Sequence, residues 1–334
     1  MNLRAARRAC VRRLLEEGGG RVRFDRWMQG ALFDVRAGYY CAGIGEIGRD
    51  FTTWPEMEKS LAIAIANWWK SIRGKSGGAL VEVGAGNGRL AMEVMRRLSW
   101  WRRSSLRILE ISPRLIAKQK ALLGGRARWV SSFAEALEDG CGAVYANELV
   151  DAFPCRVFRH MAKGRWNELW LEPGADGWRE VWLDIEQLPH SSAFDPEMPV
   201  GLRFEVHESF RNWLLDNVQS VRCARLLLID YGGLWPDYAL RWPGGTLRAY
   251  HFHQRLIPPE IYAAFGCRDI TADVNFTDLA EWAREAGWEI IRCSALRDFL
   301  VEFGRFKRFH PQLMVEGGAA DAFYVLECSR GGQF

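Results

Sequence analysis

The sequence lacks several features that would assign a function class directly. Its eight cysteines include no C-x-x-C pair and no histidine partner at ligand spacing, so we expect reduced cysteines and neither a metal site nor a disulfide framework. No stretch approaches 18 uninterrupted apolar residues, so we expect no membrane insertion. The net charge is only +4, and basic residues cluster only at 4–13 and 95–103, which is too weak a pattern for a nucleic-acid partner.

The composition is that of an ordinary globular protein. Hydrophobic residues make up 49% of the 334 residues and charged residues 26%, which is enough for one large domain or two modest ones. The arginine-rich start is compatible with a mitochondrial targeting sequence, but an amphipathic helix over 3–16 is the favoured interpretation. We therefore expect a cytoplasmic protein, or one of the mitochondrial matrix if the source is eukaryotic.

The order of predicted elements divides the chain into four segments. The pattern over 1–76 is helical and irregular. From Ala79 strands and helices alternate, which is typical of a parallel α/β sheet. The alternation stops near 155, where a β-hairpin is predicted across Lys163-Gly164, and it resumes with "RLLLIDYG". The predicted domains are an N-terminal helical or cap segment (1–76), a cofactor-binding half of the core (77–154), an inserted α+β substrate or lid subdomain (155–222) and a C-terminal half of the core (223–334).

A glycine-rich loop follows the first strand of this core, in "LVEVGAGNGRL" at 80–90. Gly84, Gly86 and Gly88 alternate after Glu82, which makes the pattern E-x-G-x-G-x-G. A dinucleotide-binding loop needs G-x-G-x-x-G, and its third glycine would fall on Arg89. The spacing is typical of S-adenosylmethionine (SAM)-dependent methyltransferases and favours SAM over a dinucleotide or a purely structural turn.

Two acids complete the predicted cofactor site. SAM has no phosphate and carries a positive sulfonium, so a bare loop with nearby carboxylates suits it better than an anion site at a helix N-terminus. Glu82 is expected beside the ammonium group of the cofactor. Glu110 ends the second strand of the core, where its carboxylate can accept charge-assisted hydrogen bonds from both ribose hydroxyls.

Six strings extend the pattern over nearly the whole chain: "GYY", "GRDFTTWPE", "LVEVGAGNGRL", "ANELVDAFP", "IDYG" and "GTLRAYHFHQ…DITADVNFTDLA". In this order they resemble the MidA-type methyltransferase family. The resemblance implies a Rossmann-like class I methyltransferase core, an α/β fold with a mostly parallel seven-stranded sheet. It also implies symmetric dimethylation of an arginine on a respiratory complex I subunit. Arg49 and Trp54 depart from the family pattern, so they leave the substrate open.

The substrate candidates are acids expected at the ligand-binding edge of the sheet. Asn147, Glu148 and Asp151 follow the fourth strand of the core, and open α/β sheets bind ligands at that edge. Carboxylates can orient a guanidinium bidentately and accept its proton. Asn147 is also a cofactor candidate. The alternative is a helix start, with Asn147 as N-cap and the two acids near the positive end of the dipole.

Further candidates come from other segments. Asp50 and Glu56 lie on the N-terminal segment, where they are equally suited to closing a turn and starting a helix. Asp230 ends the fifth strand, where a strand-end hydrogen bond to a neighbouring loop is the alternative. His253 matches a histidine of the family but is more often a structural residue than a base. Asp269 is expected to brace a loop.

The glycine loop predicts a SAM-dependent enzyme, and the resemblance implies a protein arginine methyltransferase whose partner is a protein substrate, such as a subunit of a complex I-like dehydrogenase. A small molecule or another protein side chain is the first alternative acceptor. A SAM-binding assembly factor without turnover is the second alternative, and a nicotinamide oxidoreductase is a distant third. Whether the protein forms a homodimer is left open by the sequence.

Overall fold

The computed structural model groups the chain into two compact units. Unit 1 contains residues 1–52, 150–211 and 234–278, and unit 2 contains residues 53–149, 212–233 and 279–334. The residues that the structure describes are 2–42, 55–72, 78–98, 106–138, 142–175, 177–185, 187–218, 221, 224–251, 254–304, 314 and 317–331.

The sheet of unit 2 has seven strands along its continuous path in the described residues. Its strands are β2 (Ala79–Val83), β3 (Leu106–Leu109), β4 (Arg128–Val130), β5 (Gly142–Asn147), β10 (Ala224–Gly233), β15 (Glu289–Ala295) and β16 (Phe323–Arg330). They run in the order β15-β16-β10-β5-β2-β3-β4. The pairs from β10 to β4 are parallel, whereas β16 is antiparallel to both of its neighbours. This order confirms the predicted Rossmann-like α/β core.

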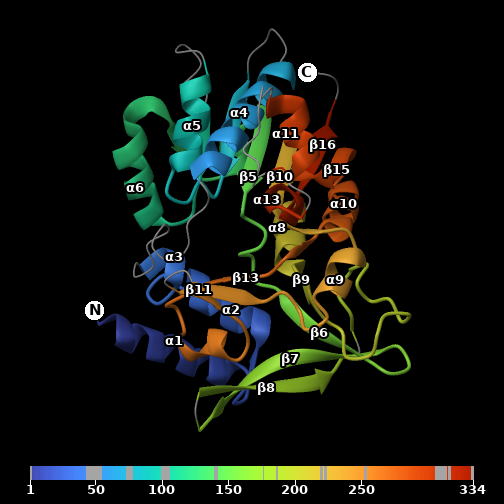
Figure 1. The fold of residues 1–334 in the computed structure, drawn as a ribbon. Coiled ribbons are helices and arrows are strands. Elements are labelled where there is room, and N and C mark those ends of the chain that lie inside the picture. The colour runs from blue at the N-terminus through green and yellow to red at the C-terminus, as the bar shows by residue number, and fades with distance from the viewer. Residues whose placement is uncertain are drawn as a thin grey trace. The chain divides into compact units, whose positions relative to one another are not determined.

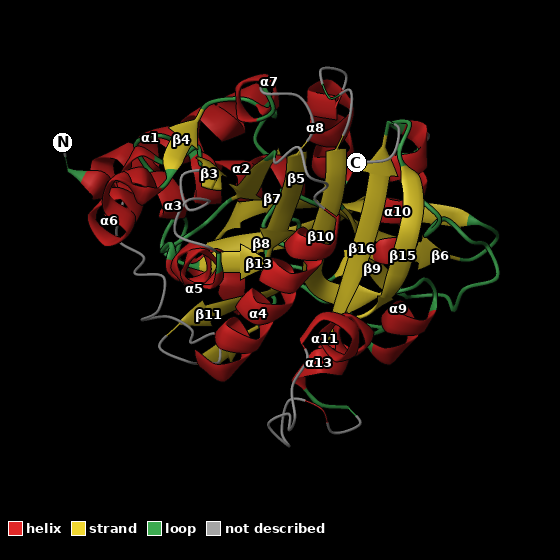
Figure 2. Cartoon of the chain, turned by 90° about the horizontal axis from the view of Figure 1, so that it is seen from above, coloured by secondary structure: helices red, strands yellow, loops and turns green. Residues whose placement is uncertain are grey.

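Helices cover this sheet. They are α4 (Pro55–Ile72), α5 (Arg89–Arg97), α6 (Pro113–Leu123), η2 (Gly124–Arg126), α7 (Phe133–Ala136), α11 (Leu296–Gly304) and α13 (Ala319–Ala322), while α8 (Glu208–Val218) and α10 (Phe276–Glu285) cross the unit boundaries. Figure 2 shows α4 beside α5 and α11, which agrees with its contacts. Apolar side chains of α4 and α5 share one buried core with β2, β3 and β5, as expected for strands that are covered by helices.

Unit 1 combines helices with antiparallel sheets (Figure 1). The helices are α1 (Leu3–Glu17), α2 (Phe24–Phe33), α3 (Tyr39–Ala42), α9 (Asp237–Arg241) and η3 (Glu260–Ala263). The larger sheet contains β1 (Val22–Arg23), β6 (Arg156–Met161), β7 (Arg165–Gly174), β8 (Gly177–Asp184) and β9 (Arg203–Val206). The smaller contains β11 (Arg248–His251), β12 (Gln254–Leu256) and β13 (Asp269–Thr271), and β14 (Val274–Asn275) follows it along the chain.

Local patterns predicted most of these elements. The predicted hairpin is formed by β6 and β7, and Lys163 and Gly164 have φ values of 64° and 63° in the three-residue loop between the paired Met161 and Arg165. The segmentation differs from the four predicted segments. The inserted strands share one core with α1 and α2 and also with residues 247–272, which the sequence had placed in the C-terminal half of the Rossmann-like core. Such packing between distant segments leaves no local pattern.

Membrane insertion was not expected from the sequence. Among the helices in the described part of the chain, none combines the length and apolar character that a membrane crossing needs.

Candidate functional site

The loop between β2 and α5 has a left-handed backbone at alternate residues. Gly84, Gly86 and Gly88 have φ values of 68°, 53° and 80°, a region that strains residues with a Cβ atom. A Cβ atom on Gly84 would also lie only 2.7 Å from Leu149 Cδ1. The glycine spacing is therefore a requirement of the main chain, which a ligand can approach closely here.

Glu110 directly follows β3 and lies near this loop. Its half-buried carboxylate accepts hydrogen bonds from the Ser112 N–H at 3.0 Å and from Gln119 Nε2 at 3.1 Å. Burial raises the pKa of Glu110, while these hydrogen bonds act in the opposite direction. The carboxylate is thus held in one orientation beside the glycine loop.

Gln119 joins the acid to the loop. Its side chain is fully buried, and Nε2 also donates to the Gly86 carbonyl at 3.0 Å while Oε1 accepts from Trp129 Nε1 at 2.9 Å. No sequence motif pointed to Gln119. The available signal was a polar residue on the buried face of α6, in line with Leu115 and Leu123.

Glu82 is almost fully buried, with 3% of its surface exposed. Its carboxyl group accepts a hydrogen bond from the Tyr145 hydroxyl at 2.8 Å, and the two residues face each other in the parallel pair β2–β5. Burial raises the pKa of Glu82 to about 8, and the nearby charge of Glu110 adds to the shift. Among the described residues no cationic side chain forms an ion pair with Glu82, so its carboxyl group is mostly protonated at neutral pH.

The segment after β5 is a strained turn. Glu148 has a φ of 50°, and Lys163 is the other non-glycine residue with a positive φ in the described part of the chain. Such a conformation costs about 1–3 kcal/mol and persists only where the surroundings enforce it. No helix begins within the described residues 148–154. The alternative interpretation of this segment, a capped helix start, is therefore wrong.

Main-chain hydrogen bonds enforce this turn. The Glu148 N–H donates to the Ile229 carbonyl at 3.0 Å, and the Leu149 N–H donates to Asp230 Oδ2 at 3.1 Å. Asp230 is buried, and its Oδ1 accepts from the Tyr231 N–H at 2.9 Å. Asp230 thus bonds the loop after β5 from within β10, which continues to Gly233 and so does not end at Asp230 as predicted, and that bond holds Glu148 in place.

Asn147 carries a buried acceptor with no partner among the described residues. Its Nδ2 donates to Glu148 Oε1 at 3.1 Å, but Oδ1 is buried and accepts no hydrogen bond from the described residues. Leaving a buried polar atom unpaired costs about 1–3 kcal/mol. The arrangement therefore suits a ligand that brings its own hydrogen-bond donor.

Unit 1 contains a separate group of acids. Asp151 and Asp269 are buried, and Asp269 Oδ1 accepts a hydrogen bond from the Tyr40 hydroxyl at 2.5 Å. Burial raises the pKa of Tyr40 well above its usual value, and the charges of Asp269 and Asp151 raise it further. Both carboxylates thus raise the pKa of one phenol, and Asp269, the first residue of β13, braces Tyr40.

Four further residues from the sequence analysis lie outside the described part of the chain. Asp50 and His253 lie outside the described residues, as do Arg49 and Trp54. Glu56 belongs to α4, but its side chain is not among those described. Within the described residues, no group of histidine, cysteine and acidic side chains could hold a metal ion.

Comparisons with known proteins agree with this geometry. The model of a family described as S-adenosyl-L-methionine-dependent methyltransferases matches residues 60–294. Protein arginine methyltransferase NDUFAF7 from Danio rerio is 26% identical over 85% of this chain and 74% of its own length. The mitochondrial homologue from Drosophila melanogaster is 26% identical over 77% of this chain but only 65% of its own length, so this chain spans slightly less than two thirds of that relative.

A solved structure supports the cofactor as well as the fold. A COG1565 superfamily member from Burkholderia thailandensis, crystallised with S-adenosyl-homocysteine, is 25% identical and superposes with a TM-score of 0.83. The match covers 98% of this chain and 93% of that one, and a native crystal structure of such a protein gives a TM-score of 0.80. SAM is accordingly the cofactor, and the sequence prediction of SAM over a dinucleotide is confirmed.

The residues described above fit SAM. We propose that the main chain at Gly84, Gly86 and Gly88 lies against the nucleoside and that Glu110 accepts the ribose hydroxyls. Asn147 Oδ1 suits the ammonium group of the amino-acid part because it is a buried acceptor without a donor. Glu82 adds a carboxyl group that a nearby cation would ionise.

The first prediction concerns the loop. Gly86→Val should abolish SAM binding in titration calorimetry, because a β-branched residue cannot adopt a φ of 53° without displacing the main chain. Gly124→Val is the matched control, since Gly124 has a φ of 59° in the same unit but lies outside the loop. Wild-type affinity in the Gly86 variant would contradict the prediction.

The second prediction concerns the ribose acceptor. Glu110→Ala should weaken SAM by about 1.5–3 kcal/mol, the contribution of a hydrogen bond to a charged group. Glu138→Ala removes an exposed acid of the same unit that pairs with Arg128 and should leave the affinity unchanged. Equal dissociation constants for the Glu110 variant and the wild type would exclude Glu110 from the site.

The third prediction concerns pH. Because the folded-state pKa of Glu82 lies near 8 and the ordinary value is 4.5, the ligand-free folded state binds more protons than the unfolded state between these values. Its free energy of unfolding should therefore decrease as pH rises from about 4.5 to about 8. Urea unfolding should show this slope in the wild type and a smaller slope in Glu82→Gln. Identical slopes in the two proteins would argue against a buried, protonated Glu82.

Proposed function

Because this chain belongs to the family of S-adenosyl-L-methionine-dependent methyltransferases, we propose that it methylates an arginine side chain of a protein. The observation that carries this proposal is the strained turn at Glu148, which holds a carboxylate and the Asn147 amide directly after β5. Strain of this kind is concentrated at active sites and ligand clamps.

An arginine acceptor needs a carboxylate. The guanidinium group is protonated at ordinary pH and is a poor nucleophile in that form. When bound, SAM would supply an electrophilic methyl group. One guanidinium nitrogen would form a bond to the methyl carbon as the methyl–sulfur bond breaks, S-adenosyl-homocysteine would be the leaving group, and the nitrogen would lose a proton. Glu148 can hold the guanidinium by charge-assisted hydrogen bonds and accept that proton.

Glu148 and Asp151, the two described acids proposed to contact the substrate, differ in the structural observations that support them. Glu148 belongs to unit 2, in which the glycine loop lies, and Asp230 and Ile229 fix the main chain around it. Asp151 comes three residues later in the chain and belongs to unit 1, where it acts with Asp269 on Tyr40. We retain Asp151 as a second substrate residue, and Asp230 as a residue that positions Glu148.

The relatives support the class of substrate. Those from fly and zebrafish carry the name protein arginine methyltransferase, at 26% identity. We propose symmetric dimethylation of an arginine on a subunit of a complex I-like dehydrogenase, as the resemblance of the sequence motifs implies. Mass spectrometry of such subunits from cells with and without this protein tests the proposal, which predicts a gain of two methyl groups at one arginine.

The fourth prediction distinguishes an effect on methyl transfer from an effect on SAM binding. Glu148→Gln should keep SAM affinity within about threefold but lower methyl transfer at least about 100-fold, the usual contribution of a general base. Asp151→Asn should lower transfer in the same direction. The measurement is incorporation of labelled methyl groups into protein from cells that lack the enzyme, with Glu138→Gln as the control. Full turnover in both variants would remove these acids from the reaction, and label only in small molecules would favour a different acceptor.

A further inference from the structure

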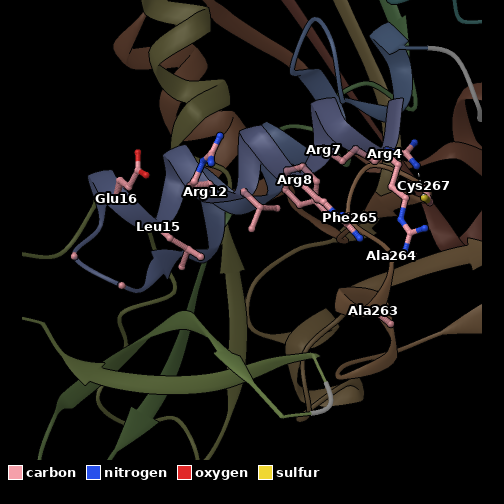
Figure 3. A pocket seen from close by; sticks show the side chains of 13 residues that line it. Arg4, Arg7, Arg8, Arg12, Leu15, Glu16, Ala263, Ala264, Phe265 and Cys267 are labelled. Carbon is pink, nitrogen blue, oxygen red and sulfur yellow. Dashed lines mark hydrogen bonds between the residues drawn. The ribbon is translucent and has the colours of Figure 1, made fainter. Parts of the chain in front are cut away.

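A groove in unit 1 lies outside the residues considered so far. It has a volume of about 900 Å³ and is lined by α1 and by the segment 263–267 (Figure 3). Side chains of α1 line it in two rows, and within each row successive residues are four positions apart. The first row is Arg4, Arg8, Arg12 and Glu16. The second is Arg7, Val11 and Leu15. Residues four apart lie on the same helix face, so both rows run along the groove.

The two rows differ in exposure. The first row is exposed and forms a rim, whereas the second is half-buried and lies deeper, beside Ala263, Ala264 and Phe265. The groove thus has apolar side chains at Val11, Leu15 and Phe265, and an exposed edge on which Arg4, Arg8 and Arg12 are followed by Glu16. Figure 3 shows the rim arginines projecting from α1.

The rim arginines differ from Arg7 in their contacts. Within the described part of the chain, no carboxylate forms an ion pair with Arg4, Arg8 or Arg12. Arg7 differs from them, because its guanidinium group donates to the carbonyls of Ala37 and Gly266 and to Cys267 Sγ. Arg7 therefore fastens α1 to the opposite wall, and the groove keeps its shape while the three rim charges stay available.

The spacing of the rim matches an extended peptide. Successive rim arginines are about 6 Å apart along α1, because each residue rises about 1.5 Å. In an extended chain, side chains on the same face recur about every 6.6 Å. A peptide with acids at alternate positions can therefore present one carboxylate to each arginine, and the intervening apolar residues can face the floor.

Other polyanions fit less well. A single-stranded nucleic acid would need aromatic rings for its bases to stack on, and Phe265 is the one aromatic residue among the groove residues, with only 8% of its surface exposed. A membrane surface would need exposed large apolar residues on α1, and the exposed large hydrophobic residues in the described part of the chain lie elsewhere.

We propose that this groove binds an extended segment of the protein substrate in which acidic and apolar residues alternate. The proposal rests on the protein-methylating function proposed above. It adds a second contact with the substrate, through the rim formed by Arg4, Arg8 and Arg12.

The test uses a fluorescein-labelled peptide of alternating glutamate and leucine and measures anisotropy at about 50 mM and about 500 mM salt. The wild type should bind it, and binding should weaken at the higher salt concentration because exposed charges are screened there. A triple variant should bind the peptide at least about tenfold more weakly. It combines Arg4→Ala, Arg8→Ala and Arg12→Ala. Alanine is a strong helix former, so α1 should remain folded, and circular dichroism checks this.

The matched control removes three exposed arginines of the same unit that do not line the groove. Arg36→Ala, Arg165→Ala and Arg241→Ala combined should bind the peptide as the wild type does. Peptide binding that is equal in both triple variants would overturn the proposal, as would no binding by the wild type. Rim-dependent binding of oligouridylate without binding of the peptide would assign the groove to nucleic acid and would also overturn it.

Failure of this proposal can be distinguished from failure of the proposed function. Anisotropy needs neither SAM nor turnover, so a protein that binds the peptide but methylates no protein would refute the function alone. A protein that methylates arginine equally well with and without the rim would refute the groove alone. If both proposals hold, the rim variant should raise KM for the protein acceptor about tenfold with kcat unchanged.

Discussion

The left-handed backbone at Gly84, Gly86 and Gly88 is the constraint on which the rest of the site depends. It turns the chain sharply between β2 and α5 without any side chain on the three turning residues. A ligand can then approach the main chain itself. Gln119 extends this arrangement because one amide nitrogen bonds both the Gly86 carbonyl and Glu110. The loop and the acid therefore hold each other in position.

The carboxyl groups around the loop are held in different states, and this suits a cofactor that carries positive charge. Glu82 is buried and mostly neutral until a cation approaches, whereas Glu110 is half-buried and accepts several hydrogen bonds. Glu148 is held by a strained main chain rather than by burial. Environments that give neighbouring acids different pKa values are a common basis for separate roles in binding and catalysis.

The sequence predicted the parts of this structure that have a local cause. The hydrophobic run of β2, the glycine spacing and the Ser112-Pro113 start of α6 all depend on neighbours in the chain. The turn at Glu148 could not be separated from a helix start, because Asn147 with following acids fits either. The turn is stabilised over a helix start by Asp230, which lies 81 residues away in the sequence and accepts a hydrogen bond from the Leu149 N–H. Unit 1 was missed for the same reason, since three distant segments form it.

The most direct measurement of the central claim is a crystal structure of this protein with S-adenosyl-homocysteine. The account predicts the nucleoside against the Gly84–Gly88 main chain, with both ribose hydroxyls within hydrogen-bond distance of Glu110 and the ammonium group near Asn147 Oδ1. A nucleoside bound elsewhere, with Glu110 still bonded only to its protein neighbours, would contradict it.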